Sequence, residues 1–222
     1  MGKGGKMKYG ILKLAGKIGV AEVAIENTRR NPHIMERIAL YKYDEQRLQQ
    51  GDQMIIRIKG ITVRWNKAQS EKFLATNALH AVVKEAKTVY GKTRRIARVI
   101  FQNQEPQRRA LALNGQSRRI LSQWLEEARQ FYTNALVDPE VIRQLSNYGI
   151  TAERLNEEKN LLAKVEKAMA NQEKKAAEAM EITGERKLAA KELVQWMSKF
   201  FTILRLAMGK SQMLEAVGIR VK

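Results

Sequence analysis

The sequence contains no cysteine, only three prolines in 222 residues and few aromatic side chains, at 6%. Without cysteine, disulfides, thiolate catalysis and cysteine-ligated zinc sites are excluded. No apolar run reaches the roughly 20 residues that a membrane-spanning helix needs. Lys13 and Lys17 also interrupt the stretch that would form the core of a signal peptide. We therefore expect a cytoplasmic protein.

Positive charge is abundant. The chain has 41 Lys and Arg residues against 23 Asp and Glu residues, a formal net charge of +18 at pH 7. Residues 1–107 hold 21 basic and 9 acidic residues, so this first half carries +12 of the net charge. Such a charge favours nucleic acid or an anionic membrane surface as a partner, although it also serves solubility.

An 18-residue stretch occurs twice. Asn31–Leu48 (NPHIMERIALYKYDEQRL) aligns without a gap with Asp138–Leu155 (DPEVIRQLSNYGITAERL), 107 positions later. Each copy opens with a capping residue followed by proline, which is typical of a helix start. Each also has a capping residue, Asp44 or Thr151, where a further helix would begin. The pattern predicts a tandem duplication, with one helical repeat over residues 1–107, including a flexible basic tail at 1–8, and a second over residues 108–222.

The predicted fold is all-α: an elongated, coiled-coil-like bundle built from two copies of a three-helix unit. Each unit should contain a first helix, a short helix started by proline, and a very long helix with apolar residues at alternating spacings of three and four. The first helices are expected at Tyr9–Arg30 and Gln116–Val137, and the long helices at Asp44–Asn103 and Thr151–Gly209.

The long helices have polar middles, near Lys72–Asn77 and Ile182–Glu185. A hairpin could turn there and give a compact bundle. Because no proline marks either place, we expect continuous helices. Glu105–Gln116, with Pro106 and the Asn114-Gly115 pair, is predicted to be a linker.

The sequence shows no catalytic, cofactor-binding or metal-binding site. His33 and His80 stand apart and lack the paired Glu-x-x-His motifs of a di-iron bundle. The N-terminal GKGGK lacks the spacing of a phosphate-binding loop. We therefore expect a non-enzymatic protein with no cofactor, no metal and no small-molecule substrate.

Basic side chains gather on one stretch of the first long helix, and further basic pairs stand at Arg108-Arg109 and Arg118-Arg119. With few aromatic rings to stack on bases, binding there would be to phosphate groups and independent of nucleic-acid sequence. The candidate polyanion-binding residues are Lys84, Lys87, Lys92, Arg94, Arg95 and Arg98.

The equivalent stretch of the second long helix, Lys191–Arg205, is apolar on nearly every side. Such a stretch is either core or an interface between subunits. The candidate self-association residues are Trp196, Met197, Phe200 and Phe201.

Four short segments carry a resemblance to a known group of proteins: Tyr148-Gly149-Ile150-Thr151, Gln172-Glu173-Lys174, Trp196-Met197-Ser198 and Leu214–Ile219. Together they resemble uncharacterised bacterial proteins built as duplicated helical bundles. The resemblance implies the fold and carries no site residues.

Three functional hypotheses follow. The first is a structural or assembly protein, a helical subunit that self-associates into a homo-oligomer or filament. The alternative is a sequence-independent nucleic-acid-binding protein that uses the basic helix face. The third is attachment to a membrane surface through residues 9–25, although an apolar face of this kind more often packs on its own bundle.

Overall fold

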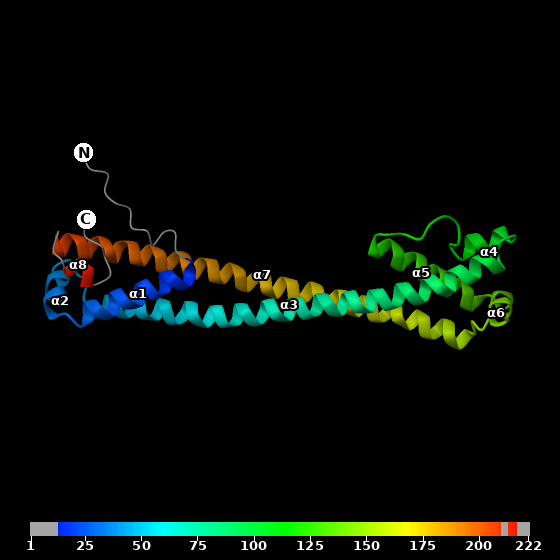
Figure 1. Ribbon diagram of the computed structural model, residues 1–222, viewed down its shortest axis with the longest axis horizontal. Coiled ribbons are helices and arrows are strands. Elements are labelled where there is room, and N and C mark those ends of the chain that lie inside the picture. Colours follow the sequence, from blue (N-terminus) through cyan, green and yellow to red (C-terminus); the bar gives the residue numbers. More distant parts are fainter. Residues whose placement is uncertain (1–12, 210–212, 217–222) are drawn as a thin grey trace, which may run out of the picture. The chain divides into compact units, whose positions relative to one another are not determined.

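The computed structural model describes residues 13–209 and 213–216 (Figure 1). Within these ranges the chain is all-α, without a strand, as predicted. The N-terminal tail at 1–8, the first residues of the predicted first helix and the C-terminal residues 217–222 lie outside the described part. The helices are α1 (Leu14–Arg29), α2 (Pro32–Ala39), α3 (Glu45–Ile100), α4 (Glu105–Ala110), α5 (Leu121–Val137), α6 (Pro139–Ser146), α7 (Ala152–Met208) and α8 (Met213–Ala216).

Both long helices are continuous. Helix α3 has 56 residues and α7 has 57, and neither breaks at its polar middle. The prediction of continuous helices is confirmed, and the hairpin alternative is not observed. The one glycine in the middle of α7, Gly184, is accommodated because a single glycine costs a helix only about 1 kcal/mol relative to alanine.

The caps expected from the sequence are formed. The Asn31 side chain accepts a hydrogen bond from the Ile34 N–H at the start of α2. Asp138 accepts hydrogen bonds from the N–H groups of Glu140 and Val141 at the start of α6. These bonds satisfy helix N–H groups that would otherwise lack a partner.

The turns after α2 and α6 have the same geometry, 107 residues apart. Lys42 has a φ of 58° and Gly149 a φ of 74°, both in the left-handed region. The next residue closes each turn: the Tyr43 N–H donates to the Ile38 carbonyl at 3.1 Å, and the Ile150 N–H donates to the Leu145 carbonyl at 3.2 Å. This is the Schellman ending of a helix, and it occurs after both α2 and α6.

The chain forms two compact units that do not follow the two halves of the sequence. Unit 1 comprises residues 1–69 and 178–222, and unit 2 comprises residues 70–177. Both long helices pass from one unit into the other. Each unit therefore combines parts of both predicted repeats. The predicted boundary at residue 107 lies inside unit 2 and is not a boundary between units.

In unit 1, α1 and α2 pack with the first part of α3 and the last part of α7. The two long helices run antiparallel there, as the ion pairs Arg57–Glu192 at 2.7 Å and Arg64–Glu185 at 2.6 Å show. Arg29 ties α1 to α3 through Glu45 at 2.9 Å and Asp52 at 2.7 Å. The apolar face of α1 is buried in this core, so the described part of the segment proposed for membrane attachment packs on its own bundle.

The four candidate self-association residues are core residues of unit 1. Trp196, Met197, Phe200 and Phe201 are all less than 10% exposed. The Phe200 ring lies 5.0 Å from the Trp196 ring, 5.9 Å from the Phe201 ring and 5.8 Å from the Tyr43 ring, between centroids. Within this fold they form no exposed surface, because α1, α2 and the start of α3 cover the apolar stretch of α7.

Gly51 in α3 makes room for the Trp196 indole. A Cβ at this position would lie 2.5 Å from Trp196 Cη2 and 2.8 Å from Ile25 Cδ1. We expect the Gly51→Ala substitution to destabilise the protein by about 1–3 kcal/mol in urea unfolding, because overpacking forces neighbouring side chains from their rotamers.

Gly60, also inside α3, provides the control because a Cβ there would meet nothing within 4 Å. Gly60→Ala should stabilise the protein by about 0.5–1 kcal/mol through helix propensity alone. Equal stability of the two variants would contradict a tight contact at Gly51.

In unit 2, α5 and α6 pack against the last part of α3 and the first part of α7. Buried rings form the centre of the core, with Tyr90 edge-on to Trp124, Phe131 and Tyr132 at centroid distances of 5.7–6.0 Å. Two sequence predictions need correction here. The expected linker contains the short helix α4, with Pro106 in its first turn, and α5 begins at Leu121 instead of Gln116.

Candidate anion-binding surface

The structure separates the six predicted polyanion-binding residues into three kinds. Lys84, Lys92 and Arg98 are exposed on α3. Lys87, which is half-buried, and Arg95, which is exposed, line a hollow beside α3. Arg94 is buried, at 6% exposure.

Arg94 is a structural anchor, which corrects the sequence-based prediction. Its Nε lies 3.2 Å from Glu127 Oε1, and both side chains are less than 10% exposed. Its Nη2 donates to the backbone carbonyls of Ala112 at 3.3 Å and Gly115 at 3.2 Å. The guanidinium is thus already engaged by α5 and by the segment after α4. The faces of a helix repeat about every 3.6 residues, and the sequence alone did not show that this position faces inward.

Glu127 completes the attachment of this segment. Its carboxylate accepts hydrogen bonds from the Tyr90 hydroxyl at 3.0 Å and from the Arg118 backbone N–H at 3.0 Å, in addition to its ion pair with Arg94. Burial raises the pKa of the Tyr90 hydroxyl, and the Glu127 charge raises that pKa further, so Tyr90 remains a donor. Residues 112–118 are therefore held beside α3. We call residues 112–119 the strap.

The strap brings two arginines from outside α3 to the basic face of α3. Arg118 and Arg119 line the same hollow as Lys87 and Arg95, and no Asp or Glu lines it. We call this hollow the α3 groove. It has a volume of about 450 Å³, and its other lining residues are Tyr90, Gly91, Arg94, Ser117 and Trp124.

The floor and walls of the α3 groove orient its cations. The Lys87 ammonium lies 5.4 Å from the centroid of the Trp124 ring, a cation–π distance. Arg95 Nε donates to the Gly91 carbonyl at 3.0 Å. Gly91 has no side chain to fill the groove, and a Cβ there would meet nothing within 4 Å.

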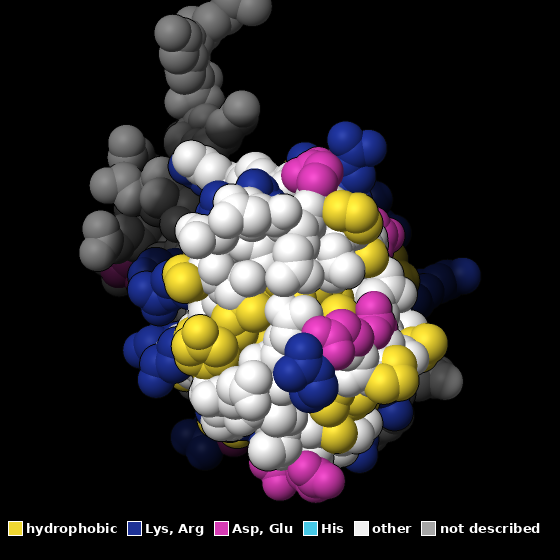
Figure 2. Space-filling model, turned by 90° about the vertical axis from the view of Figure 1, so that its right-hand side faces the viewer, with side chains coloured by type: hydrophobic (Ala, Val, Ile, Leu, Met, Phe, Trp, Pro, Cys, Tyr) yellow, Lys and Arg dark blue, Asp and Glu magenta, His cyan; other side chains and the backbone are white. Residues whose placement is uncertain are grey.

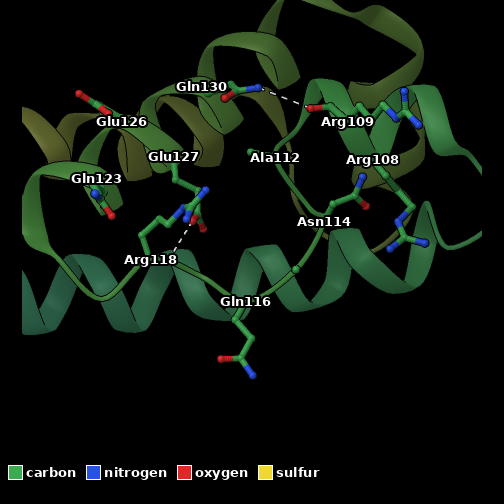
Figure 3. Close-up of a pocket in the computed structure, with 11 residues that line it drawn as sticks. Arg108, Arg109, Ala112, Asn114, Gln116, Arg118, Gln123, Glu126, Glu127 and Gln130 are labelled. Atoms are coloured by element: carbon green, nitrogen blue, oxygen red, sulfur yellow. Dashed lines mark hydrogen bonds between the residues drawn. The ribbon is translucent and has the colours of Figure 1, made fainter.

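A second hollow, of about 690 Å³, lies between the strap and α5 and shares Arg118 with the groove (Figure 3). Figure 3 shows the Arg118 side chain extending toward Glu127 and Gln116 pointing away from α5. Gln130 Nε2 donates to the carbonyls of Arg109 at 3.5 Å and Ala110 at 3.2 Å. This hollow contains both Arg108 and Glu126, so its mixed charge favours anions less than the groove does.

The end of unit 2 that carries α4 and α6 is not strongly basic. Figure 2 looks onto this end and shows Lys and Arg side chains interspersed with acidic, hydrophobic and neutral ones. This end is therefore a weaker candidate for anion binding than the α3 groove, which no Asp or Glu lines.

A further polar network lies inside unit 2. Glu158 is 5% exposed and accepts hydrogen bonds from Thr93 Oγ1 at 2.7 Å, the Tyr132 hydroxyl at 3.0 Å and Arg154 Nε at 2.9 Å. Burial raises the pKa of the Tyr132 hydroxyl, and the Glu158 charge raises that pKa further. The network joins α3, α5 and α7, and the sequence analysis did not predict it.

No family model, curated protein or solved structure matches this chain. The resemblance to duplicated helical bundles therefore stays a sequence-based prediction. Among the described residues, no three His, Asp or Glu side chains are grouped so that they could hold a metal ion. None of the described helices is long and apolar enough to cross a membrane.

The sequence predicted some residues of this surface but not how residues from α3 and the strap come together. Lys87 and Arg95 were predicted from their spacing on one helix. Arg118 and Arg119 were recognised as a basic pair in the sequence. Gly115, predicted to interrupt helical structure, lies between α4 and α5 with a φ of 71°. Their place beside α3 depends on Arg94 and Glu127, which no local pattern connects.

Proposed function

We propose that this protein binds the phosphate backbone of nucleic acid without reading its sequence, through the basic surface of unit 2. The observation that carries this proposal is the convergence of Lys87, Arg95, Arg118 and Arg119 on one groove that no acidic side chain lines. Cations of this kind release counterions from nucleic acid when they replace them at the phosphates.

The rings near the groove support a mode of binding that does not involve bases. Tyr90 is 1% exposed and Trp124 is 2% exposed, so neither presents a free face on which a base could stack. Arginine and lysine side chains that contact only phosphates position a nucleic acid and carry no sequence information.

Salt dependence tests the proposed function. In a triple Arg95→Gln, Arg118→Gln, Arg119→Gln variant, affinity for duplex DNA should fall for every sequence. The slope of log K against log salt should decrease by about 3, close to 1 for each phosphate that the variant no longer neutralises. Fluorescence anisotropy titrations at several salt concentrations measure both quantities.

The matched control removes the same charge elsewhere in unit 2. Lys164, Lys167 and Lys174 are exposed on α7, away from the lining of the groove. The triple Lys→Gln variant at these positions should keep the wild-type slope. If both variants lost the same affinity for DNA, binding would depend on the net charge of the protein alone. That result would contradict binding at a defined surface.

Self-association is the second candidate, on a surface other than the one predicted. Ile56 and Val63 lie seven residues apart on α3, and each is 70% exposed. Exposed apolar side chains aligned on one helix face are typical of an interaction site. A particle mass equal to the 25.4 kDa of one chain, measured by light scattering on nuclease-treated protein, would remove this candidate.

We further infer that the chain arose by tandem duplication. The matched helices support this origin: α1, α2 and α3 have 16, 8 and 56 residues, and α5, α6 and α7 have 17, 8 and 57. A profile of residues 31–48 built from related chains should score residues 138–155 above every other window. A score no better than those windows would contradict the duplication.

A further inference from the structure

We propose that the α3 groove is a site for a phosphate group that carries two negative charges, in the form of a terminal phosphomonoester of a nucleic-acid strand. The inference rests on the proposed function and deepens it, because it distinguishes the end of a strand from its interior. It is based on a comparison between the positive charge of the groove and the negative charge of the phosphate group that would bind there.

The groove concentrates more positive charge than one backbone phosphate can neutralise. Five cationic side chains line it. Arg94 pairs with Glu127, and within the described part of the chain none of the other four, Lys87, Arg95, Arg118 and Arg119, forms an ion pair with a carboxylate. The nearest buried acid, Glu127, already receives Tyr90, Arg94 and the Arg118 backbone. Like charges gathered in one groove repel each other, and an anion bound among them would relieve that repulsion.

The groove has the size of a site for one small group. At about 450 Å³, it falls in the range of sites for small ligands, roughly 300–1,000 Å³. An internal phosphodiester brings one charge, whereas a phosphomonoester brings about 1.5 to 2 and has three acceptor oxygens. The terminal group therefore matches the groove better.

The donors in the groove suit such a group. A guanidinium binds two phosphate oxygens at once, and Arg95, Arg118 and Arg119 supply three of them. Lys87 adds a point charge that the Trp124 ring holds in place. The bare backbone at Gly91 leaves the floor between these side chains open.

Gly91 also provides a variant that changes the groove and preserves the fold. Because a Cβ at this position meets nothing within 4 Å, Gly91→Ala and Gly91→Glu should both fold. Alanine leaves the groove open, while glutamate places a carboxylate among the four cations. Circular dichroism and thermal unfolding of the two variants verify that both are folded.

The experiment compares binding of one short single-stranded oligonucleotide in three forms: with a 5′-phosphate, with a 3′-phosphate and with hydroxyls at both ends. We expect at least one phosphorylated form to bind the wild-type protein about tenfold more tightly than the hydroxyl form, a difference of about 1.4 kcal/mol. Gly91→Ala should retain this preference and Gly91→Glu should lose it. The form that is preferred identifies the end of the strand.

Inorganic triphosphate serves as a competitor and tests whether the preference for a terminal phosphate arises in the α3 groove. At a saturating concentration it should remove the preference of the wild-type protein for the phosphorylated oligonucleotide over the hydroxyl form. Equal affinity for all three forms would overturn this inference and leave the proposed function intact. A preference that persists unchanged in Gly91→Glu would also overturn it, whereas absence of binding to any form would overturn the proposed function itself.

Discussion

Replacing Glu158 by alanine should destabilise unit 2 by about 3–5 kcal/mol, the usual cost of removing one partner from a buried charged network. The substitution would leave the Tyr132 hydroxyl and Thr93 Oγ1 buried without their acceptor. It would also remove the carboxylate that pairs with Arg154 at 2.9 Å. Because these partners come from three helices, the loss should open the packing of α3, α5 and α7 together.

The adjacent residue provides the control. Glu157 is exposed, and Glu157→Ala should change stability by less than about 0.5 kcal/mol. Hydrogen exchange followed on peptides of each unit measures where the structure opens. Faster exchange should appear in residues 70–177 for Glu158→Ala and in neither unit for Glu157→Ala. Wild-type protection of residues 70–177 in Glu158→Ala would show that the buried network contributes little.

Replacing Phe200 by alanine should destabilise unit 1 by about 3–5 kcal/mol, because it removes a fully buried ring and leaves a cavity. Phe200 is 0% exposed and contacts the rings of Trp196, Phe201 and Tyr43. Urea unfolding and hydrogen exchange on peptides of unit 1 measure the loss. This result would place the apolar stretch of α7 in the core of the subunit.

The same variant also tests the prediction that this stretch joins subunits. Leu206→Ala is the control, because Leu206 lies on α7 and is 60% exposed; its effect should stay within about 0.5 kcal/mol. If Phe200→Ala instead kept its unfolding midpoint and lowered the particle mass in light scattering, Phe200 would belong to an interface between copies.

Three pairs of residues that lie 107 positions apart differ in chemistry between the two units. Residues 107 positions apart are Thr93 and Phe200, Arg94 and Phe201, and Gly51 and Glu158. Unit 1 uses the apolar member of each pair, and unit 2 uses the polar one. The polar choice in unit 2 has a consequence for the surface, since Arg94 is what attaches the strap and so places Arg118 and Arg119 beside α3.

The sequence by itself determined the local structure. The capping residues before Pro32 and Pro139 define two helix starts, and the absence of proline keeps α3 and α7 unbroken, because these signals act within one or two turns of the chain. The spacing of Lys87 and Arg95 likewise placed both on one side of a helix.

Only the tertiary structure decided which faces meet. Helical periodicity shows that residues share a face, but not which other helix covers that face or whether water does. For this reason Trp196 and Phe200 could be either core or interface until α1 and α2 were seen to cover them. Arg94 was predicted to bind a polyanion, but the structure pairs it with the buried side chain of Glu127. The strap lies beside α3 because Arg94 donates hydrogen bonds to two of its carbonyls and Glu127 accepts one from the Arg118 N–H. No sequence pattern connects Arg94 with Glu127.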